Sequence, residues 1–200
     1  MLPSGVRLIH VRHGETDWNN EGRLQGQLDI PINATGRTQA ARNGETMKAW
    51  LEANAIAADG LTFVASPLAR TMETMEIVRA KLGLSGEFPV DGRLKEISFG
   101  EWSGFTYEEL SAGPAQPLVR ARKRDKWSFR PPGGETYGDL ADRVGEWLST
   151  VSQDTVAVSH GGVFRVLHGH LTGTPWHEVP RIAAPQDRFA VFEGDRVTLL

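Results

Sequence analysis

The chain has 200 residues, a formal net charge of −3 at pH 7, 40% hydrophobic residues and 24% charged residues. These values are typical of one globular domain, which we expect to span residues 1–200. The small negative charge provides no basic field that would attract nucleic acid. The sequence has no cysteine, which excludes disulfides, zinc–thiolate sites, iron–sulfur clusters and thiol nucleophiles.

The hydrophobic residues give no sign of a membrane span or an export signal. No apolar run approaches the ~18 residues of a membrane span. The apolar patch at residues 8–11 is shorter than the ~7–15 residues of a secretory signal core. We therefore expect a cytoplasmic protein without a membrane partner.

Strands and helices alternate along the first half of the chain. In order, the pattern predicts a strand at 6–11 (VRLIHV), a helix at 35–51, a strand at 60–65 (GLTFVA), a helix from 67 to 81, and a third strand at 87–90 (EFPV). Thr35 can cap the first helix, and Ser66-Pro67 is a good N-cap and first-turn proline for the second. The proline of EFPV predicts a sheet edge, because proline has no N–H to donate.

The second half begins with a segment of different character. Residues 101–132 are rich in Gly, Pro and charge, and we expect one or two helices there that lie over the main sheet. The pattern then predicts a loop at 131–135 (PPGGE), a helix begun by a Thr136–Asp139 capping pair, a buried strand in TVAVSHGG (155–162), a helix at 163–171, and a hairpin at 188–200 turning at Glu193–Asp195. This alternation predicts an α/β fold with a mostly parallel sheet.

Basic side chains follow the predicted non-edge strands. Arg12 and His13 end the first, Ser66 and Arg70 follow the second, and Ser159 and His160 end the third. The carboxyl ends of parallel strands lie at one edge of the sheet, where ligands of α/β proteins bind. Two arginines, two histidines and a helix N-terminus at that edge favour a phosphate site.

Each of these residues also has an ordinary structural interpretation. A strand-end histidine is commonly a hydrogen-bonded core residue, a lone arginine a surface ion pair, and Ser-Pro only a cap. The joint arrangement favours the phosphate site instead. No P-loop, HExxH motif or aspartate cluster is present, and His168 and His170 lie on different sides of a helix, so no metal site is predicted. A phosphoryl site without a metal needs its own nucleophile, which a neutral imidazole can supply.

A phosphoryl transfer of this kind also needs a general acid. The spacing of the carboxylates does not choose one among them.

Five segments in order, VRHGETDWN, SPLAR, LKEISFGEW, PPGGET and VSHGGVFR, resemble the histidine phosphatase superfamily, also called the phosphoglycerate mutase-like superfamily. The resemblance covers residues 8 to about 171. It implies a three-layer α/β sandwich, with a mostly parallel sheet, helices on both faces and a small helical lid insertion at about 101–132.

The resemblance also implies a role for each matching residue. His13 would be the nucleophile that becomes phosphohistidine, and Glu96 would protonate the leaving group and later activate water. The implied residues around the phosphoryl group are Arg12, Arg70 and His160, and the implied substrate-binding residues are Asn19, Gln25, Gly26 and Gly161. An ordinary turn is an equally good interpretation of Gln25 and Gly26. No cofactor is implied.

The chain departs from the family pattern in three places. Asn33 stands where relatives often have Thr or Ser, and we expect little effect. The segment APQDRFAVF (184–192) lacks the Asn-rich pattern of many relatives, so its contacts with the His160 loop are not predicted. Residues 103–129 align with no subfamily, and we expect them to set substrate selectivity.

Three functions remain open at this stage. The first is a metal-independent phosphomonoesterase acting on a small phosphorylated metabolite. The second is a cofactor-dependent phosphoglycerate mutase, for which Phe99 stands in place of the tyrosine expected three places after Glu96. The third is a non-catalytic phospholigand binder, which the presence of His13 and Glu96 disfavours. A second copy of the chain, in a homodimer, is a further candidate partner.

The basic run of the lid segment also has two interpretations. It contains Arg120, Arg122, Lys123, Arg124 and Lys126. These side chains could attract a carboxylate or a second phosphate of the substrate, or they could form a solvated helix face.

Overall fold

A computed structural model describes residues 2–200 and contains a five-stranded sheet with the order β2-β3-β1-β4-β5. The strands are β1 (Arg7–Arg12), β2 (Thr62–Ala65), β3 (Thr155–Ser159), β4 (Phe189–Glu193) and β5 (Arg196–Leu199). β1 and β2 both pair with β3 in parallel, whereas β4 is antiparallel to β1 and to β5. The sheet is therefore mixed, with β4 alone running against the other strands.

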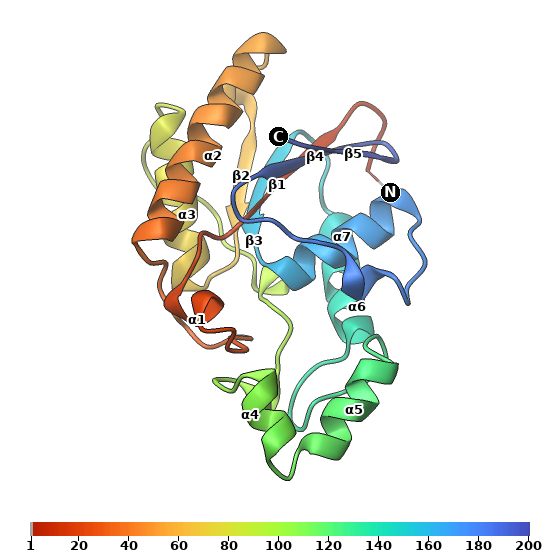
Figure 1. Ribbon diagram of the computed structural model, residues 1–200. Helices are drawn as coiled ribbons and strands as arrows, with labels where there is room; N and C mark the ends of the chain where they lie inside the picture. The colour runs from red at the N-terminus through yellow and green to blue at the C-terminus, as the bar shows by residue number, and fades with distance from the viewer. Residues whose placement is uncertain (1) are drawn as a thin grey trace.

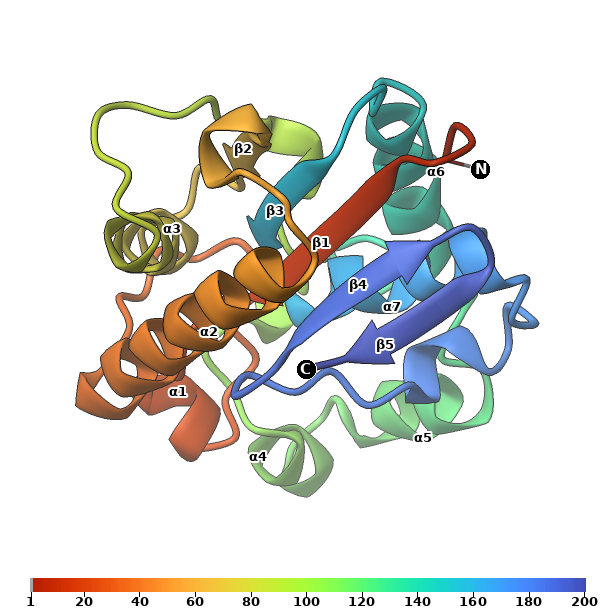
Figure 2. The same cartoon turned by 90° about the horizontal axis from the view of Figure 1, so that it is seen from above.

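Four long helices cover the two faces of the sheet (Figures 1 and 2). They are α2 (Ala34–Ala53) and α3 (Ala69–Lys81) on one face, and α6 (Tyr137–Leu148) and α7 (Gly161–Thr172) on the other. The shorter helices are α1 (Asp17–Asn20), α4 (Tyr107–Ala112) and α5 (Gln116–Arg124), with 3₁₀ turns at Ala58–Gly60, Gly92–Leu94, Gly100–Trp102 and Val179–Arg181. These layers confirm the α/β sandwich.

The alternation of side chains along β1 explains why the strand has apolar residues on both of its faces. Leu8 packs into the core formed with α6 and α7, and His10 faces the same side, where it contacts Phe164 with ring centroids 5.5 Å apart. Ile9 and Val11 pack against α2 and α3. Successive side chains of a strand point to opposite faces, so a strand covered on both faces must be hydrophobic on both.

Three predictions about element boundaries are wrong, and each has a physical reason. Asn33, not Thr35, caps α2, because its side chain accepts from the Gly36 amide. Ser66 does not cap α3, because the helix begins only at Ala69; the Ser66 hydroxyl is hydrogen-bonded to His160, and Asp29 Oδ1 accepts from the Ala69 amide instead. EFPV forms only one isolated bridge, between Val90 and Ala65.

Other predictions are confirmed. The capping box of Thr136 and Asp139 begins α6, and β4 and β5 form the C-terminal hairpin. α4 and α5 lie within residues 101–132, where one or two helices were expected, and we call these residues the lid segment. Figure 1 places them beyond the carboxyl ends of β1 and β3. No helix within residues 2–200 is both long and apolar enough to cross a membrane.

The two ends of the lid segment are joined by backbone contacts. The Glu101 amide donates to the Pro132 carbonyl at 2.9 Å, and the Glu135 amide donates to the Ser98 carbonyl at 2.9 Å. Gly100 has a φ of +54° and lies so close to the Pro132 carbonyl that any Cβ would clash with it. Glycine is therefore required at this closure.

Candidate active site

The carboxyl ends of the three parallel strands bring together residues that are far apart in the sequence. His13 follows β1 and His160 follows β3, and the centroids of their rings are 5.2 Å apart. Ser66, at the end of β2, lies 2.8 Å from His160 Nε2. Arg70 is on the first turn of α3 and is fully buried. The carboxyl ends of neighbouring parallel strands lie at the same edge of the sheet, so the residues that follow them are close together.

His13 is held in one tautomer. Its Nδ1 is 2.8 Å from the carbonyl oxygen of Gly14, which can only accept, so Nδ1 carries the proton and Nε2 keeps its lone pair. Burial, followed by the positive charges of Arg12 and Arg70, lowers the pKa of His13 well below 6.5. The ring is therefore neutral, and its free nitrogen has the electronic state that a nucleophile needs.

His160 is also buried and neutral. Its Nε2 is hydrogen-bonded to Ser66 Oγ, while its Nδ1 is buried without a partner in the protein. Burial, followed by the charges of Arg70 and the other cations, lowers its pKa well below 6.5. Leaving a buried polar atom without a hydrogen bond costs free energy. Nδ1 is therefore suited to form a hydrogen bond with a bound ligand.

Two arginines are fixed beside these rings by backbone carbonyls. Arg70 donates from Nη1 to Leu28 and from Nη2 to Gly26, both at 2.7 Å. Arg12 donates from Nη1 to Ala184 at 2.5 Å. In each guanidinium Nε is buried without a partner. Burial lowers the pKa of both to about 10, so both remain cationic at neutral pH and attract an oxyanion.

Glu96 lies against the N-terminus of α7. Its Oε1 accepts from the Ile97 amide at 2.8 Å, and both carboxylate oxygens lie 3.1 Å from the Gly162 amide. A Cβ at position 162 would clash with Oε1, so glycine lets the carboxylate approach the helix. Arg143 fixes the loop, since it donates to the Glu96 carbonyl at 3.0 Å and forms an ion pair with Glu135 at 2.9 Å.

The four predicted substrate-binding residues surround this cluster in different ways. Asn19 Oδ1 accepts from the Thr16 amide at 3.2 Å and so caps α1. Gln25 is buried, and its Oε1 has no protein partner. The Gly26 carbonyl accepts from Arg70. Gly161 lies beneath the guanidinium of Arg12, and a Cβ there would lie 3.3 Å from Arg12 Nε.

Sequence reasoning missed two residues that contact the cluster. Gln186 Nε2 donates to the His13 carbonyl at 3.0 Å and to Asn19 Oδ1 at 3.1 Å. Arg165, on α7, lies beside Arg12 above Gly161. A Cβ at Gly161 would be 3.3 Å from Arg165 Nη1 and 3.3 Å from Arg12 Nε. Arg165 ends the motif VSHGGVFR, which is a signal that could have found it. Gln186 stands in a loop without a motif.

The acidic and histidine side chains of residues 2–200 form no group of three or more that could hold a metal ion. The charge at the site is instead provided by guanidinium groups, which recognise phosphate through parallel N–H donors.

Comparison with known proteins defines the class of this site. The family model of the histidine phosphatase superfamily (branch 1) matches residues 8–197. The chain therefore belongs to this superfamily.

Individual relatives carry both phosphatase and mutase names. The chain is 33% identical over 181 residues to the glucosyl-3-phosphoglycerate phosphatase of Mycolicibacterium vanbaalenii, covering 84% of this chain and 75% of that protein. It is 34% identical over 183 residues to the "Probable phosphoglycerate mutase GpmB" of Salmonella newport, covering 86% and 78%. The crystal structure of a mycobacterial glucosyl-3-phosphoglycerate phosphatase complexed with VO3 has a TM-score of 0.77 and 28% identity, covering 98% and 97%. The phosphatase names support the class of phosphoric monoester hydrolases.

Proposed function

We propose that the protein is a metal-independent phosphomonoesterase that transfers a phosphoryl group from a small phosphorylated metabolite to His13 Nε2 and then to water. The observation that carries this proposal is the state of His13. Its Nδ1 proton is held by Gly14 and its pKa is lowered, so an unprotonated nitrogen lies among buried cations.

The unpaired donors around His13 support a phosphoryl substrate. Arg12 Nε, Arg70 Nε and His160 Nδ1 are all buried without a protein partner. Phosphoryl oxygens would accept from them, with Ser66 donating to His160 Nε2 so that Nδ1 carries the proton. These donors are already in place before charge develops on the equatorial oxygens, which is how preorganised sites stabilise a transition state.

The reaction then has two steps. His13 Nε2 forms a bond to phosphorus while the bond to the ester oxygen breaks, and the leaving oxygen takes a proton from protonated Glu96. Water next attacks phosphorus and gives a proton to Glu96, the bond to Nε2 breaks, and inorganic phosphate leaves. Glu96 Oε2 is the better oxygen for this proton, because Oε1 also accepts from Ile97.

The intermediate provides a direct test. A rapid quench of the reaction with p-nitrophenyl phosphate should leave phosphate on the His13 peptide, lost in acid and retained in alkali. His168→Gln, which changes a histidine whose ring packs against Phe164 and Phe192, should retain the label, and His13→Ala should lose it. Turnover should also persist in EDTA without added magnesium. A strict need for a divalent ion, or a label on another residue, would contradict the proposal.

Mutase activity is a second candidate, because a relative at 34% identity carries a mutase name. A mutase must exclude water while its substrate reorients. The lid segment is a short cover in which Gly113 ends α4 and Pro114 separates α4 from α5. Incubation with 3-phosphoglycerate and catalytic 2,3-bisphosphoglycerate should release inorganic phosphate. Rapid formation of 2-phosphoglycerate with little phosphate would favour the mutase.

A further inference from the structure

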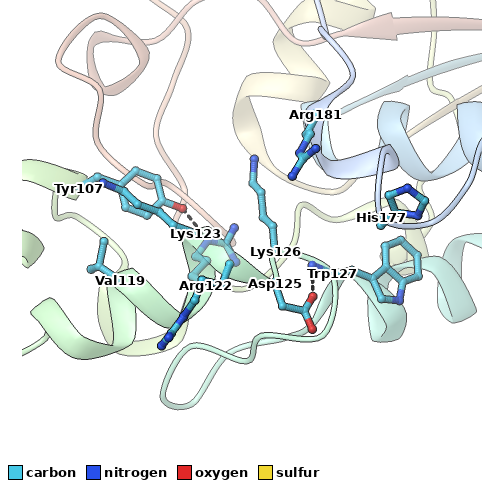
Figure 3. A pocket seen from close by; sticks show the side chains of 10 residues that line it. Tyr107, Val119, Arg122, Lys123, Asp125, Lys126, Trp127, His177 and Arg181 are labelled. Carbon is cyan, nitrogen blue, oxygen red and sulfur yellow. Dashed lines mark hydrogen bonds between the residues drawn. The ribbon is translucent and has the colours of Figure 1, made fainter.

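A cavity, which we call the lid cavity, lies between the lid segment and the segment that contains His177 and Arg181. It has a volume of about 310 Å³, and its walls include Tyr107, Arg122, Lys126, Trp127, His177 and Arg181 (Figure 3). In Figure 3 the ends of the Lys126 and Arg181 side chains lie beside each other. None of these residues has a role in the phosphoryl site described above.

The charge of this cavity is strongly unbalanced. Its basic side chains are Arg122, Lys123, Arg124, Lys126 and Arg181, and its acidic one is Asp125. Asp125 Oδ1 already accepts from the amides of Trp127 at 3.1 Å and Ser128 at 2.9 Å. The ion pairs found among residues 2–200 involve none of the five basic side chains. The cavity is therefore suited to an anion.

Arg122 is fixed in the wall of the cavity. Only 3% of it is exposed, its Nε donates to the Tyr107 hydroxyl at 2.7 Å, and its guanidinium lies 5.4 Å from the centroid of the Phe99 ring. Its Nη1 is buried without a partner in the protein. A buried cation with an unused donor is costly unless an anion satisfies it, so Arg122 has the properties of a binding group.

Lys126 is fixed on the other side of the same cavity. Its Nζ donates to the Pro180 carbonyl at 2.8 Å, which leaves two further N–H groups. Burial, followed by the charges of Arg165, Arg122 and Arg181, lowers the pKa of Lys126 to about 8. The effect of Arg165 matters because this residue also lies beside Arg12 in the phosphoryl site.

One short segment connects the two sites. Alternate carbonyls of residues 180–184 accept from three cations in turn: Pro180 from Lys126 at 2.8 Å, Ile182 from Arg165 at 2.8 Å, and Ala184 from Arg12 at 2.5 Å. Four residues of extended chain span at most about 14 Å. The row of cations therefore runs from the phosphoryl site to the lid cavity over a distance that one small molecule can cover.

We propose that this cavity binds a second anionic group of the substrate, so that the protein prefers phosphate esters that also carry a carboxylate or a second phosphate. Arg122 and Lys126 bind the second anionic group, and Arg181 adds positive charge to the cavity. Arg165 adds positive charge between the cavity and Arg12. The proposal rests on the phosphatase function proposed above and specifies its substrate class.

Matched substrates test this preference. The six-carbon set is 6-phosphogluconate, glucitol 6-phosphate and glucitol 1,6-bisphosphate, which differ only in a carboxylate, a hydroxymethyl or a phosphate at one end. The three-carbon pair is 3-phosphoglycerate and glycerol 3-phosphate. A charge-assisted contact corresponds to about a tenfold to hundredfold preference in kcat/KM for the acidic member. The bisphosphate distinguishes whether phosphate or carboxylate is preferred.

Substitutions of the cavity residues test whether they cause the preference for acidic substrates. Lys126→Met and Arg181→Met should reduce the ratio of kcat/KM between acidic and neutral members to within about threefold of one, mainly through KM. Arg122→Met should do the same if it folds. Arg120→Met is the matched control, because it removes an exposed charge from the same helix outside the cavity, and it should retain the wild-type ratio. A wild-type ratio near one for both chain lengths, or a ratio unchanged in Lys126→Met and Arg181→Met, would overturn the proposal.

The two proposals fail in different ways. Absence of p-nitrophenyl phosphate turnover by the wild-type protein would refute the phosphatase function. The cavity would then still be tested by calorimetry, as the ratio of dissociation constants of 6-phosphogluconate and glucitol 6-phosphate for the His13→Ala protein. Equal dissociation constants would refute the second anionic subsite.

Discussion

The phosphoryl site and the lid cavity are both positively charged, but they are constructed differently. The side chains of the phosphoryl site, such as His13, Arg70 and His160, are almost fully buried and follow strands of the central sheet. The cations of the lid cavity come from α5, the loop after it and the segment that contains Arg181, and most of them are exposed. In the proposed function, the phosphoryl group that all substrates share would bind at the rigid sheet edge, whereas the variable part of each substrate would meet the lid segment.

The two sites also differ in what their charge does. Burial and positive charge keep His13 neutral, which is the state that the proposed nucleophile needs. In the lid cavity the same two effects lower the pKa of Lys126 only to about 8, so a lysine there remains mostly charged at neutral pH and suited to binding. Changes at the phosphoryl site should therefore affect turnover of every phosphate ester.

The largest effect is expected for His13→Ala. Removing the covalent nucleophile of a hydrolase can cost about 10⁶-fold in kcat, and we expect at least ~10⁴-fold here for aryl and alkyl phosphates alike. Steady-state release of inorganic phosphate measures it. If the activity of His13→Ala is within tenfold of wild type, His13 is not the nucleophile, and the phosphoryl site does not differ from the lid cavity in being catalytic.

Glu96→Gln should depend on the leaving group. General acid catalysis contributes about 10²–10⁴-fold, and an alkyl alkoxide needs the proton far more than p-nitrophenolate does. In pre-steady-state measurements of the phosphorylation step, we expect a much larger loss for an alkyl phosphate. Equal losses for the two esters would mean that Glu96 is not the acid.

Arg70→Lys should lower kcat/KM by about tenfold to a hundredfold, since lysine keeps the charge but loses the planar fork of donors. The loss should be similar for acidic and neutral substrates, because Arg70 belongs to the phosphoryl site. A loss confined to acidic substrates would indicate that the two regions act as one, and an unchanged kcat/KM would exclude Arg70 from phosphate binding.

Buried neutral histidines should make the protein less stable in acid. Burial, followed by the charge of Arg12, lowers the pKa of His10 from 6.5 to about 3. Below pH 6.5 the unfolded chain binds a proton that the folded chain does not, so the free energy of unfolding falls by up to about 1.4 kcal/mol per pH unit for this residue. His13 and His160 add to the same trend.

Urea unfolding between about pH 7 and pH 5 measures this slope. His10→Gln should reduce the slope by up to about 1.4 kcal/mol per pH unit. An unchanged slope would mean that His10 is not neutral in the folded protein.

The sequence predicted best what depends on local pattern. The strands and the residues that follow them, such as His13 and His160, could be found because hydrophobic runs and the parallel-sheet rule place them together. Glu96 could not be chosen from spacing, because it stands in a loop and reaches α7 only in the folded chain. The assignment of Ser66 as a cap failed for a related reason, since its partner His160 is 94 residues away.

Long-range contacts account for the other omissions. Gln186 contacts the His13 carbonyl across 173 residues, and no local pattern marks it. Arg122 was one of five similar basic residues in the sequence, and only the fold distinguishes it as the buried one. Which side chain of a charged run faces inward is decided by tertiary packing, which periodicity over a short helix does not specify.

The closure at the base of the lid segment gives this architecture a modular character. Since Ser98, Gly100, Pro132 and Glu135 bring the two ends of the insertion together through main-chain contacts, the intervening loop can change its length and composition without moving the sheet. Recombination between relatives at these two points would exchange Arg122 and Lys126 together, whereas Arg181 would stay with the rest of the chain. The same two points mark where the lid segment of a relative could be inserted between unchanged parts of the sheet, with Arg181 as the residue to change along with it.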